Sequence, residues 1–431
     1  CLGVSDSFSF FFPFFPTSFV MGNLVRCLVA LALLACLSTA DQCDGRHPVV
    51  LIPGILGTVL HADLDLPTRE GLPDQCPHHF TDQPIWIDVG QTINYKCFKN
   101  YFASSFDRDA GVWKRMEGIN FTIPKWGKVF PVDELAPGAV TGKLIPYFHG
   151  IIKKLTALGY VDGVNMTGAG FDWKDVPSDE WVARVKDLVE TVVANNGGCP
   201  AVLIAHSMGC PFSYYFMMKM GEEWVKKNVH MFIPTSPAWM GAVKALDVMI
   251  AGLDYNVPLA GKYFAPLLRH IPTVWLLLPW EDAYPNIPLA TTPSKTYYFA
   301  DLVQLLNDGN ATDVEGKLKA TRGLFEQWGR NYATPPPVPV RAFVGHGKNT
   351  VISFKFKKDI VPHDPEGVWD TPTRIKGDGD GTVPYQSLVY ATEKWAKMEG
   401  TDVKTFFYDK MGHVPLLRDS DIIDEIIAQF H

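Results

Sequence analysis

Positive charge is scarce in this sequence of 431 residues. Lysine and arginine together number 39, against 46 aspartate and glutamate residues, and the formal net charge is −7 at pH 7. No run rich in Lys or Arg occurs along the chain. A nucleic-acid partner would need a basic patch, so this class of function is excluded. Any contact with a membrane is expected to depend on apolar side chains rather than on attraction to anionic lipids.

Two glycine-rich segments lack the residues that would make them cofactor or metal sites. Gly168-Ala169-Gly170 does not extend to a dinucleotide-binding fingerprint, because Trp173 stands where the third glycine belongs. For the acidic segment 377–383 the competing interpretation is a calcium loop, but an EF-hand would have Gly at Val383 and Glu at Val389. We therefore predict that the protein needs neither a metal nor an organic cofactor.

The first 40 residues contain no apolar run that would make a good membrane-spanning helix. After residues 1–20, which we interpret as translated upstream sequence, comes a stretch typical of a signal peptide. Arg26 supplies positive charge, residues 27–37 form a short apolar core, and small residues lead to a cleavage point after Ala40. The alternative is an uncleaved anchor over residues 7–37, although this range contains two prolines and an arginine.

Cysteine is sparse beyond the expected cleavage point, where five remain and none follows Cys210. An odd number in an oxidising compartment leaves at least one free thiol or an intermolecular bond. Three Asn-x-Thr sequons support entry into the secretory pathway and predict glycosylation. We expect a protein that is secreted or is lysosomal or vacuolar. The five cysteines are Cys43, Cys76, Cys97, Cys199 and Cys210, and the sequons begin at Asn120, Asn165 and Asn310.

Buried strands alternate with amphipathic helices along most of the chain. Residues 47–53, 201–206 and 229–233 are short, continuous apolar runs, which are typical of strands covered on both faces. Residues 181–194 and 208–220 show helical spacing of their apolar side chains. This order predicts an α/β fold whose mostly parallel sheet carries helices on both faces.

Two regions interrupt this alternation within the predicted domain, residues 41–431. Residues 58–130, after the first strand, are loop-rich and are predicted to form an insertion. Residues 236–335 are apolar but irregular, contain several prolines, and are predicted to form a cap or lid. The strand pattern resumes after the cap, and a helix that Ser420 is predicted to cap ends the chain.

The most informative segment is Ala205-His206-Ser207-Met208-Gly209, which a buried strand enters and a helix leaves. On such a turn a serine is held in a strained backbone conformation that lifts its hydroxyl above the sheet. Small residues are needed two positions before and after the serine, and Ala205 and Gly209 meet this need. We predict that Ser207 is a nucleophile; the alternative is a serine that only caps the helix.

A serine nucleophile needs an orienting carboxylate and a histidine base, which follow it in that order in this kind of fold. His413 lies in the loop between the last strand and the last helix, whereas His431 is the end of the sequence. We therefore predict His413 as the base. Asp378 and Asp380 lie in the same glycine-rich loop, and from the residues alone both are candidates for the acid.

The oxyanion that forms during acyl transfer needs two backbone N–H donors. One is predicted at Met208, directly after the nucleophile. The other belongs to the turn after the first strand, where Ile55 is the expected donor. Gly54 and Gly57 flank this position and allow a close approach of the backbone.

Seven short segments of the chain are informative when they are taken together and in sequence order. They are HPVVLIPGILG at 47–57, Trp86-Ile87-Asp88, Phe171-Asp172-Trp173-Lys174, AHSMG at 205–209, Ser236-Pro237-Ala238-Trp239, GDGDGTVP at 377–384 and Gly412-His413. In this order they resemble the lecithin:cholesterol acyltransferase family, which includes lysosomal phospholipase A2 and phospholipid:diacylglycerol acyltransferases. The resemblance implies an α/β-hydrolase fold with Ser207, Asp380 and His413 as a catalytic triad. It also supports Ile55 and Met208 as the oxyanion donors.

The resemblance further implies release of a fatty acyl group from a glycerophospholipid and its transfer to water or to a lipid alcohol. It implies a Cys76–Cys97 disulfide in a membrane-contacting insertion, and a lid. Trp86 and Trp239 are expected near the substrate. The expected partner is a phospholipid membrane or a lipoprotein-like lipid surface, and the chain is expected to be a monomer.

Two other functions stay open. A neutral-lipid or sterol-ester lipase would use the same catalytic residues. A non-catalytic lipid-binding protein on the same fold belongs to a different class, and it would be expected to lose a member of the triad. This sequence keeps all three.

A second disulfide is predicted from the strand order. Ile55 and Met208 must meet at one oxyanion hole, so the carboxyl ends of the strands that precede them lie together. Cys43 lies twelve residues before Ile55 and Cys199 nine before Met208, which places both cysteines just upstream of those strands, at the same edge of the sheet. Cys210 would then be the free thiol, and the alternative is that Cys43 and Cys199 are both unpaired.

Overall fold

The computed structural model describes residues 43, 46–66, 72–86, 95–135, 146–251, 265–327, 332–360 and 371–431. The chain divides into two units, Cys1–Gly45 and Arg46–His431. The predicted signal peptide and its upstream segment, residues 1–40, lie outside the described residues. All the sheets and helices given below belong to the second unit.

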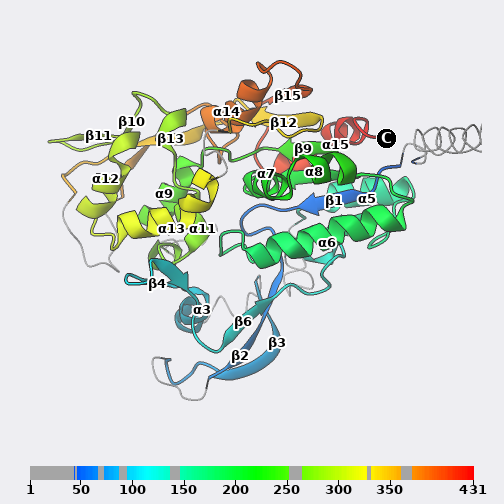
Figure 1. Ribbon diagram of the computed structural model, residues 1–431. Coiled ribbons are helices and arrows are strands. Elements are labelled where there is room, and N and C mark those ends of the chain that lie inside the picture. The colour runs from blue at the N-terminus through cyan, green and yellow to red at the C-terminus, as the bar shows by residue number, and fades with distance from the viewer. Residues whose placement is uncertain are drawn as a thin grey trace, which may run out of the picture. The chain divides into compact units, whose positions relative to one another are not determined.

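A six-stranded parallel sheet forms the centre of this unit (Figure 1). Strands β1 and β8 are buried along their whole length, which explains why their sequences are continuous apolar runs. The predicted parallel sheet is confirmed. Its order is β15 (Val403–Asp409), β12 (Val340–His346), β9 (Val229–Thr235), β8 (Ala201–His206), β1 (Val49–Ile52) and β7 (Met166–Gly168).

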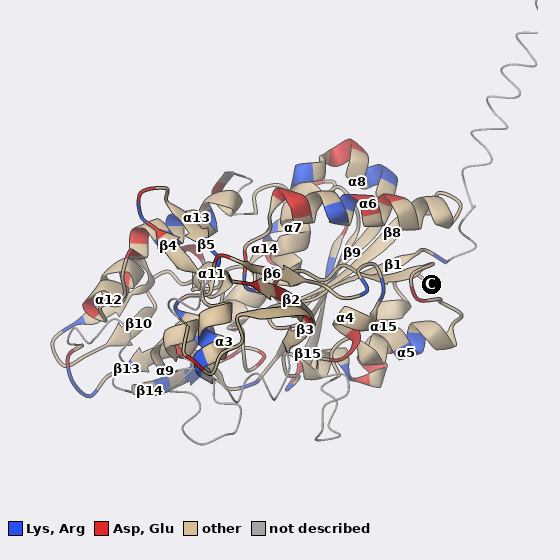
Figure 2. Ribbon diagram, turned by 90° about the horizontal axis from the view of Figure 1, so that it is seen from below, with Lys and Arg blue, Asp and Glu red and all other residues tan. Residues whose placement is uncertain are grey.

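Helices cover both faces of the central sheet, as Figure 2 shows. The side chains of Val49, Val202 and Met231 belong to the apolar core on one face, whereas Val50 and Leu203 belong to the core on the other. The alternation of side chains along each strand thus divides the interior into two clusters. The helices on the first face are α5 (His149–Ala157) and α15 (Ser420–Ile427), and those on the second are α6 (Asp179–Asn195), α7 (Gly209–Met220), α8 (Glu222–Asn228) and α14 (Tyr385–Trp395).

Capping side chains set where two of these helices begin. The Ser178 hydroxyl accepts a hydrogen bond from Trp181 N–H (3.1 Å) at the start of α6. In α15 the N-cap is Asp419, whose carboxylate accepts from Ile422 N–H (3.2 Å), so the prediction of Ser420 was wrong by one residue. The carboxylate is the stronger acceptor of the two, and its negative charge suits the helix N-terminus.

Residues 58–130, which we predicted to be loop-rich, contain a second, antiparallel sheet. Its order is β3-β2-β6, and it lies below the central sheet in the view of Figure 1. The sequence of β2, LHADLD, alternates with period two, whereas β3 is largely exposed and its pairing with β2 shifts register twice, so its own sequence does not alternate. The elements are β2 (Leu60–Asp65), β3 (His79–Trp86), α3 (Tyr95–Phe102), β4 (Ser105–Asp107), β5 (Val112–Lys114) and β6 (Ile119–Thr122), followed by α4 (Phe130–Asp133).

The described residues between 236 and 335 form helices and two strands beside the carboxyl ends of the central strands (Figure 1). One of the two strands, β10, also pairs with the later strand β13, which gives a four-stranded sheet of order β11-β10-β13-β14. Within the described ranges, no helix is both long enough and apolar enough to cross a membrane. The elements are α9 (Val243–Ala251), α11 (Pro272–Leu276), η1 (Glu281–Ala283), β10 (Pro288–Thr291), β11 (Thr296–Tyr298), η2 (Phe299–Asp301), α12 (Leu302–Asp308) and α13 (Val314–Gln327), with β13 (Thr350–Lys355), β14 (Thr373–Gly377) and η3 (Pro415–Leu417) later in the chain.

Candidate active site

Ser207 occupies a strained turn between β8 and α7. Its φ angle is +57°, in the left-handed region that side chains other than Gly rarely adopt. The turn is held by a hydrogen bond from Ser207 N–H to the Thr235 carbonyl (3.0 Å) on the neighbouring strand β9. A Cβ atom at Gly209 would overlap the Pro53 carbonyl oxygen, so the need for a small residue there has a direct steric cause.

His413 reaches Ser207 from the loop that follows β15. Its Nε2 atom lies 2.9 Å from Ser207 Oγ, and the side chain is 9% exposed. The backbone of His413 is also fixed, because its N–H donates to the Asp380 carbonyl (2.9 Å). Parallel strands place their carboxyl ends at one edge of the sheet, and this topology brings together residues 206 positions apart in the sequence.

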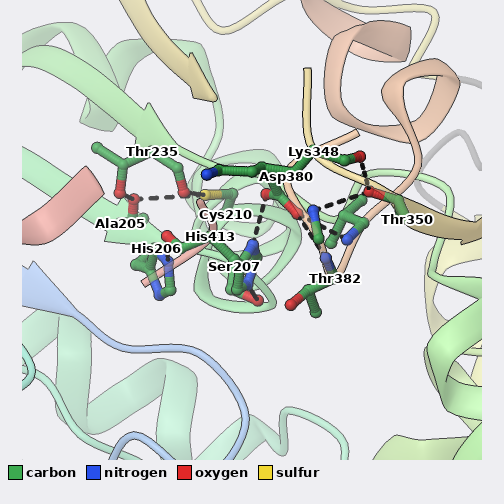
Figure 3. A network of polar contacts seen from close by, with 12 residues as sticks. Ala205, His206, Ser207, Cys210, Thr235, Lys348, Thr350, Asp380, Thr382 and His413 are labelled. Carbon is green, nitrogen blue, oxygen red and sulfur yellow. Dashed lines mark hydrogen bonds and ion pairs between the residues drawn. The ribbon is translucent and has the colours of Figure 1, made fainter. Parts of the chain in front are cut away.

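Asp380 completes the hydrogen-bonded series, which Figure 3 shows from close by. Its Oδ2 atom lies 2.6 Å from His413 Nδ1, and its side chain is fully buried. The other oxygen, Oδ1, accepts from the N–H groups of Thr382 (3.0 Å) and Val383 (2.8 Å). Because the carboxylate faces Nδ1, that nitrogen carries the proton, and Nε2 is left to accept the proton of the Ser207 hydroxyl.

Asp378, the alternative acid, has a different role. Its side chain is 52% exposed, and its Oδ1 atom accepts from the N–H groups of Gly347 and Gly379, each at 2.7 Å. These bonds tie the acidic loop to the turn after β12, where Lys348 N–H also donates to the Gly379 carbonyl (2.9 Å). Asp378 therefore shapes the loop, and Asp380 is the carboxylate that faces the imidazole.

The turn after β1 lies directly against the serine. A Cβ atom at Gly54 would be only 2.7 Å from Ser207 Cβ, so this glycine allows an approach that no other residue would permit. In the described part of the chain, the N–H groups of Ile55 and Met208 donate to no protein acceptor. Both predicted oxyanion donors are thus next to Ser207 with their hydrogen-bonding capacity unused.

A cavity of about 300 Å³ opens beside Ser207 and His413. Its walls are mostly apolar and come from the turn after β1, from α9 and from α11. Lys244 adds a charged side chain, and its Nζ atom lies 2.8 Å from Asp247 Oδ2. The lining residues are Ile55, Leu56, Tyr147, Trp173, His206, Ser207, Ala238, Ala242, Lys244, Ala245, Val248, Leu268, Val274, Leu277, Thr382, Val383, His413 and Val414.

Trp86 and Trp239, which we expected near the substrate, do not line this cavity. Trp239 is 3% exposed and packs against Tyr332 and Trp395 in the core. Trp86 lies one layer behind the wall: its Nε1–H donates to the Leu56 carbonyl (3.0 Å), and its ring packs against Trp173. Large aromatic side chains are more often core than binding surface, and this explains both placements.

The tryptophan that does line the cavity is Trp173, from the segment Phe171-Asp172-Trp173-Lys174. The Lys174 ammonium is 1% exposed, bonds both oxygens of Asp172 (2.9 and 2.7 Å) and lies 3.4 Å from the centre of the Phe121 ring. The buried ion pair fixes the backbone on either side of Trp173. The motif was visible in the sequence, but its place in the cavity wall was not.

The cysteines and sequons lie outside the site, except for one thiol. Cys76 and Cys97 form a disulfide with a Cα–Cα distance of 5.4 Å, as the family resemblance implied. Cys43 and Cys199 are each disulfide-bonded, which their predicted pairing requires. Cys210 is the free cysteine of the described residues; it is buried behind Ser207, and burial raises the pKa of its thiol.

Of the three sequon asparagines, Asn120 is exposed on β6, whereas Asn165 and Asn310 are half-buried. Nothing in the described ranges gathers three His, Cys, Asp or Glu side chains as metal ligands.

The segment from residue 79 to residue 334 matches the model of the lecithin:cholesterol acyltransferase family. The chain belongs to this family. It is 28% identical to the lysosomal phospholipase A and acyltransferase of Canis lupus familiaris, over 83% of this chain and 85% of that protein. It is 26% identical to the phosphatidylcholine-sterol acyltransferase of Homo sapiens, over 81% of this chain and 77% of that protein.

A solved structure, that of the Tle4–Tli4 complex, matches the fold with a TM-score of 0.51 and 13% sequence identity, over 88% of this chain and 97% of that chain. The predicted family and the predicted α/β-hydrolase fold are both confirmed. The chain is an acyl hydrolase or acyltransferase.

Proposed function

We propose that this protein takes a fatty acyl group from a glycerophospholipid onto Ser207 and transfers it to water or to a lipid alcohol. The observation that carries the proposal is the hydrogen-bonded series Ser207–His413–Asp380 at the wall of an apolar cavity. A serine that is backed by a histidine and a buried carboxylate is the arrangement for nucleophilic acyl transfer.

In the first half of the reaction Ser207 Oγ attacks the ester carbonyl carbon while His413 Nε2 takes the hydroxyl proton. The carbonyl oxygen becomes an oxyanion, and the N–H groups of Ile55 and Met208 stabilise it. Asp380 holds the imidazole in its orientation and stabilises the positive charge that the ring acquires. The carbon–oxygen bond to the leaving alcohol then breaks, and the imidazolium gives its proton to that oxygen.

In the second half, water or a lipid alcohol attacks the acyl-Ser207 carbonyl. His413 takes the proton of the attacking hydroxyl and returns a proton to Ser207 Oγ as the serine leaves. Both halves use the same groups, so the reaction is expected to follow ping-pong kinetics.

The substrate class is supported by the cavity and by the relatives. Apolar walls suit a fatty acyl chain. The two relatives are named as a phospholipase A and acyltransferase and as a phosphatidylcholine-sterol acyltransferase. Because one name contains phospholipase and the other phosphatidylcholine, we place phospholipid ahead of triacylglycerol or sterol ester.

The disulfides fit a protein of the secretory pathway, since such bonds persist in oxidising compartments. We propose that the mature protein is secreted or lysosomal and acts as a monomer on a membrane or lipoprotein-like lipid surface. The relatives include a lysosomal enzyme, as its name states.

The test is to incubate the purified protein with vesicles of acyl-labelled phosphatidylcholine, with and without a lipid alcohol, and with triacylglycerol droplets in parallel. We expect labelled fatty acid or labelled ester from the vesicles, and none of either from the Ser207→Ala variant. Release from the droplets alone would replace phospholipid by neutral lipid as the substrate. Binding of vesicles with no acyl release from either lipid would favour a lipid-binding protein instead.

A further inference from the structure

Two buried residues behind the triad, Tyr147 and His206, form a hydrogen-bonded chain that the reaction scheme does not use. Tyr147 precedes α5 and is 4% exposed, and His206 is the last residue of β8 and is 1% exposed. The Tyr147 hydroxyl oxygen lies 2.8 Å from Gly54 N and 2.5 Å from His206 Nδ1. The other ring nitrogen, His206 Nε2, lies 3.1 Å from the His413 carbonyl oxygen.

The two ends of this chain fix the direction of their own hydrogen bonds. The Gly54 amide can only donate, so the phenolic oxygen accepts there. The His413 carbonyl can only accept, so His206 carries its proton on Nε2. In a neutral imidazole Nδ1 is then an acceptor and takes the phenolic proton of Tyr147, so the phenol and the imidazole each act once as donor and once as acceptor, and no buried polar group along the chain is left unpaired.

Burial and a neighbouring charge keep the side chains of Tyr147 and His206 uncharged. Burial, and the neighbouring His413 after it, lower the pKa of His206 well below its ordinary value. Burial raises the pKa of the Tyr147 hydroxyl. The ring centroids of His206 and His413 are 4.7 Å apart, so a second positive charge on His206 would oppose the charge that His413 acquires in the reaction.

We infer that Tyr147 and His206 are positioning residues. They hold the turn after β1, which carries the oxyanion donor Ile55, and the base His413 in place relative to Ser207. The inference rests on the proposed function. Gly54 immediately precedes Ile55, so a hydroxyl that fixes the Gly54 N–H orients the peptide that leads to the oxyanion donor. At the other end, His206 holds the carbonyl of His413 while the Asp380 carbonyl holds its N–H. One chain thus joins the three backbone segments that must stay aligned during acyl transfer.

The decisive variant is Tyr147→Phe, which removes one oxygen atom and keeps the ring. The matched control is Tyr160→Phe: Tyr160 is 2% exposed, and its hydroxyl bonds the His47 carbonyl (3.1 Å) at the opposite end of the sheet. With a soluble p-nitrophenyl ester we expect kcat of Tyr147→Phe to fall about 10–100-fold with KM unchanged, below the cost of removing an oxyanion donor itself. Tyr160→Phe is expected to keep its kcat.

A double-mutant cycle adds a readout that a merely structural role would not move. His206→Gln offers an amide N–H for the His413 carbonyl but has no acceptor at the position of Nδ1, next to the Tyr147 hydroxyl. If the two residues act as one chain, Tyr147→Phe costs at least threefold less in the His206→Gln background than alone.

Three results separate the outcomes. Loss of kcat in Tyr147→Phe together with non-additivity supports the inference. Unchanged kcat in Tyr147→Phe, or full additivity, overturns it while leaving the triad intact. Activity in Ser207→Ala would instead overturn the proposed function on which the inference rests.

Discussion

Two pairs of neighbouring histidines lie at opposite ends of the central sheet, and the two pairs differ in their hydrogen-bonding partners. At the carboxyl end, His206 Nδ1 bonds the Tyr147 hydroxyl and His206 Nε2 bonds the His413 carbonyl. The ring nitrogens of His413 bond Asp380 and Ser207. At the amino end His47 and His230 stack with ring centroids 3.6 Å apart. There His47 Nδ1 bonds the Pro200 carbonyl (2.9 Å), and both side chains are half-buried.

The contrast shows how position in one sheet separates reactivity from stability. Carboxyl ends of parallel strands are followed by loops that converge on one place, so side chains there acquire partners from distant parts of the chain. Amino ends receive the connections from the helices, and side chains there serve packing. We therefore expect substitutions at the carboxyl end to change turnover and substitutions at the amino end to change stability.

Ser207→Ala provides the largest expected effect at the carboxyl end. Removing the hydroxyl removes the nucleophile, so acyl release should fall by several orders of magnitude. The midpoint of thermal unfolding should stay within a few degrees of the wild type, because the φ angle of +57° is no more strained for Ala than for Ser. Acyl release is measured with labelled phospholipid. Substantial activity in a preparation free of wild-type protein would refute the serine mechanism.

Asp380→Asn should be the next most damaging change, with kcat lowered by about 10⁴-fold, since an amide favours the wrong tautomer of His413. Asp378→Asn is the matched control in the same loop. It keeps an oxygen that accepts from Gly347 and Gly379, so we expect less than a tenfold loss. If Asp378→Asn were the worse of the two, the assignment of the acid would have to be exchanged.

This pair of aspartates also shows what the sequence could and could not predict. Strand–turn–helix context identified Ser207, and chain order identified His413, because both depend on local patterns. The choice of Asp380 needed the family resemblance, since the two carboxylates differ only in which way the loop folds. Tyr147 had no local signal at all: it lies in no motif, and its contacts with Gly54 and His206 span 93 and 59 residues.

The fold, like the site, has a part that could be predicted from the sequence and a part that could not. The central strands were predictable because each is buried on both faces and therefore continuously apolar. The sheet formed by β2, β3 and β6 was missed although β2 alternates with period two, because β3 is largely exposed and its pairing with β2 shifts register twice. The sequence also could not place Trp86: its large apolar surface packs equally well in a core or at a substrate, and only the tertiary contacts put it one layer behind the cavity wall.

A substitution in the apolar wall of the cavity is expected to lower activity less than the changes to Ser207 and Asp380. Val248 lines the cavity from α9 and is 6% exposed. In Val248→Phe the larger ring should occupy space meant for the acyl chain, lowering kcat/KM for long-chain substrates by about tenfold. A p-nitrophenyl acetate substrate is the internal control, because its acyl chain is too short to reach the ring. Equal losses with short and long chains would mean that this wall does not hold the acyl group.

The smallest expected effect lies at the amino end, where it concerns stability and its dependence on pH. Burial, and the adjacent His47 after it, lower the pKa of His230 from 6.5 to about 4. Between these values the unfolded chain binds a proton that the folded chain does not, so the stability that His230 contributes is complete above pH 6.5 and is lost as the pH falls toward 4. His230→Phe keeps a ring to stack on His47 and abolishes this titration, so its unfolding midpoint should fall less than that of the wild type between pH 7 and 4.5, by a few degrees.

Turnover at pH 7 should be unchanged, and His79→Phe, at an exposed histidine, should follow the wild type. The measurement is thermal unfolding by circular dichroism across that range. Parallel curves for His230→Phe and the wild type would show that His230 does not titrate as proposed. A loss of turnover would show that the two ends of the sheet are not independent.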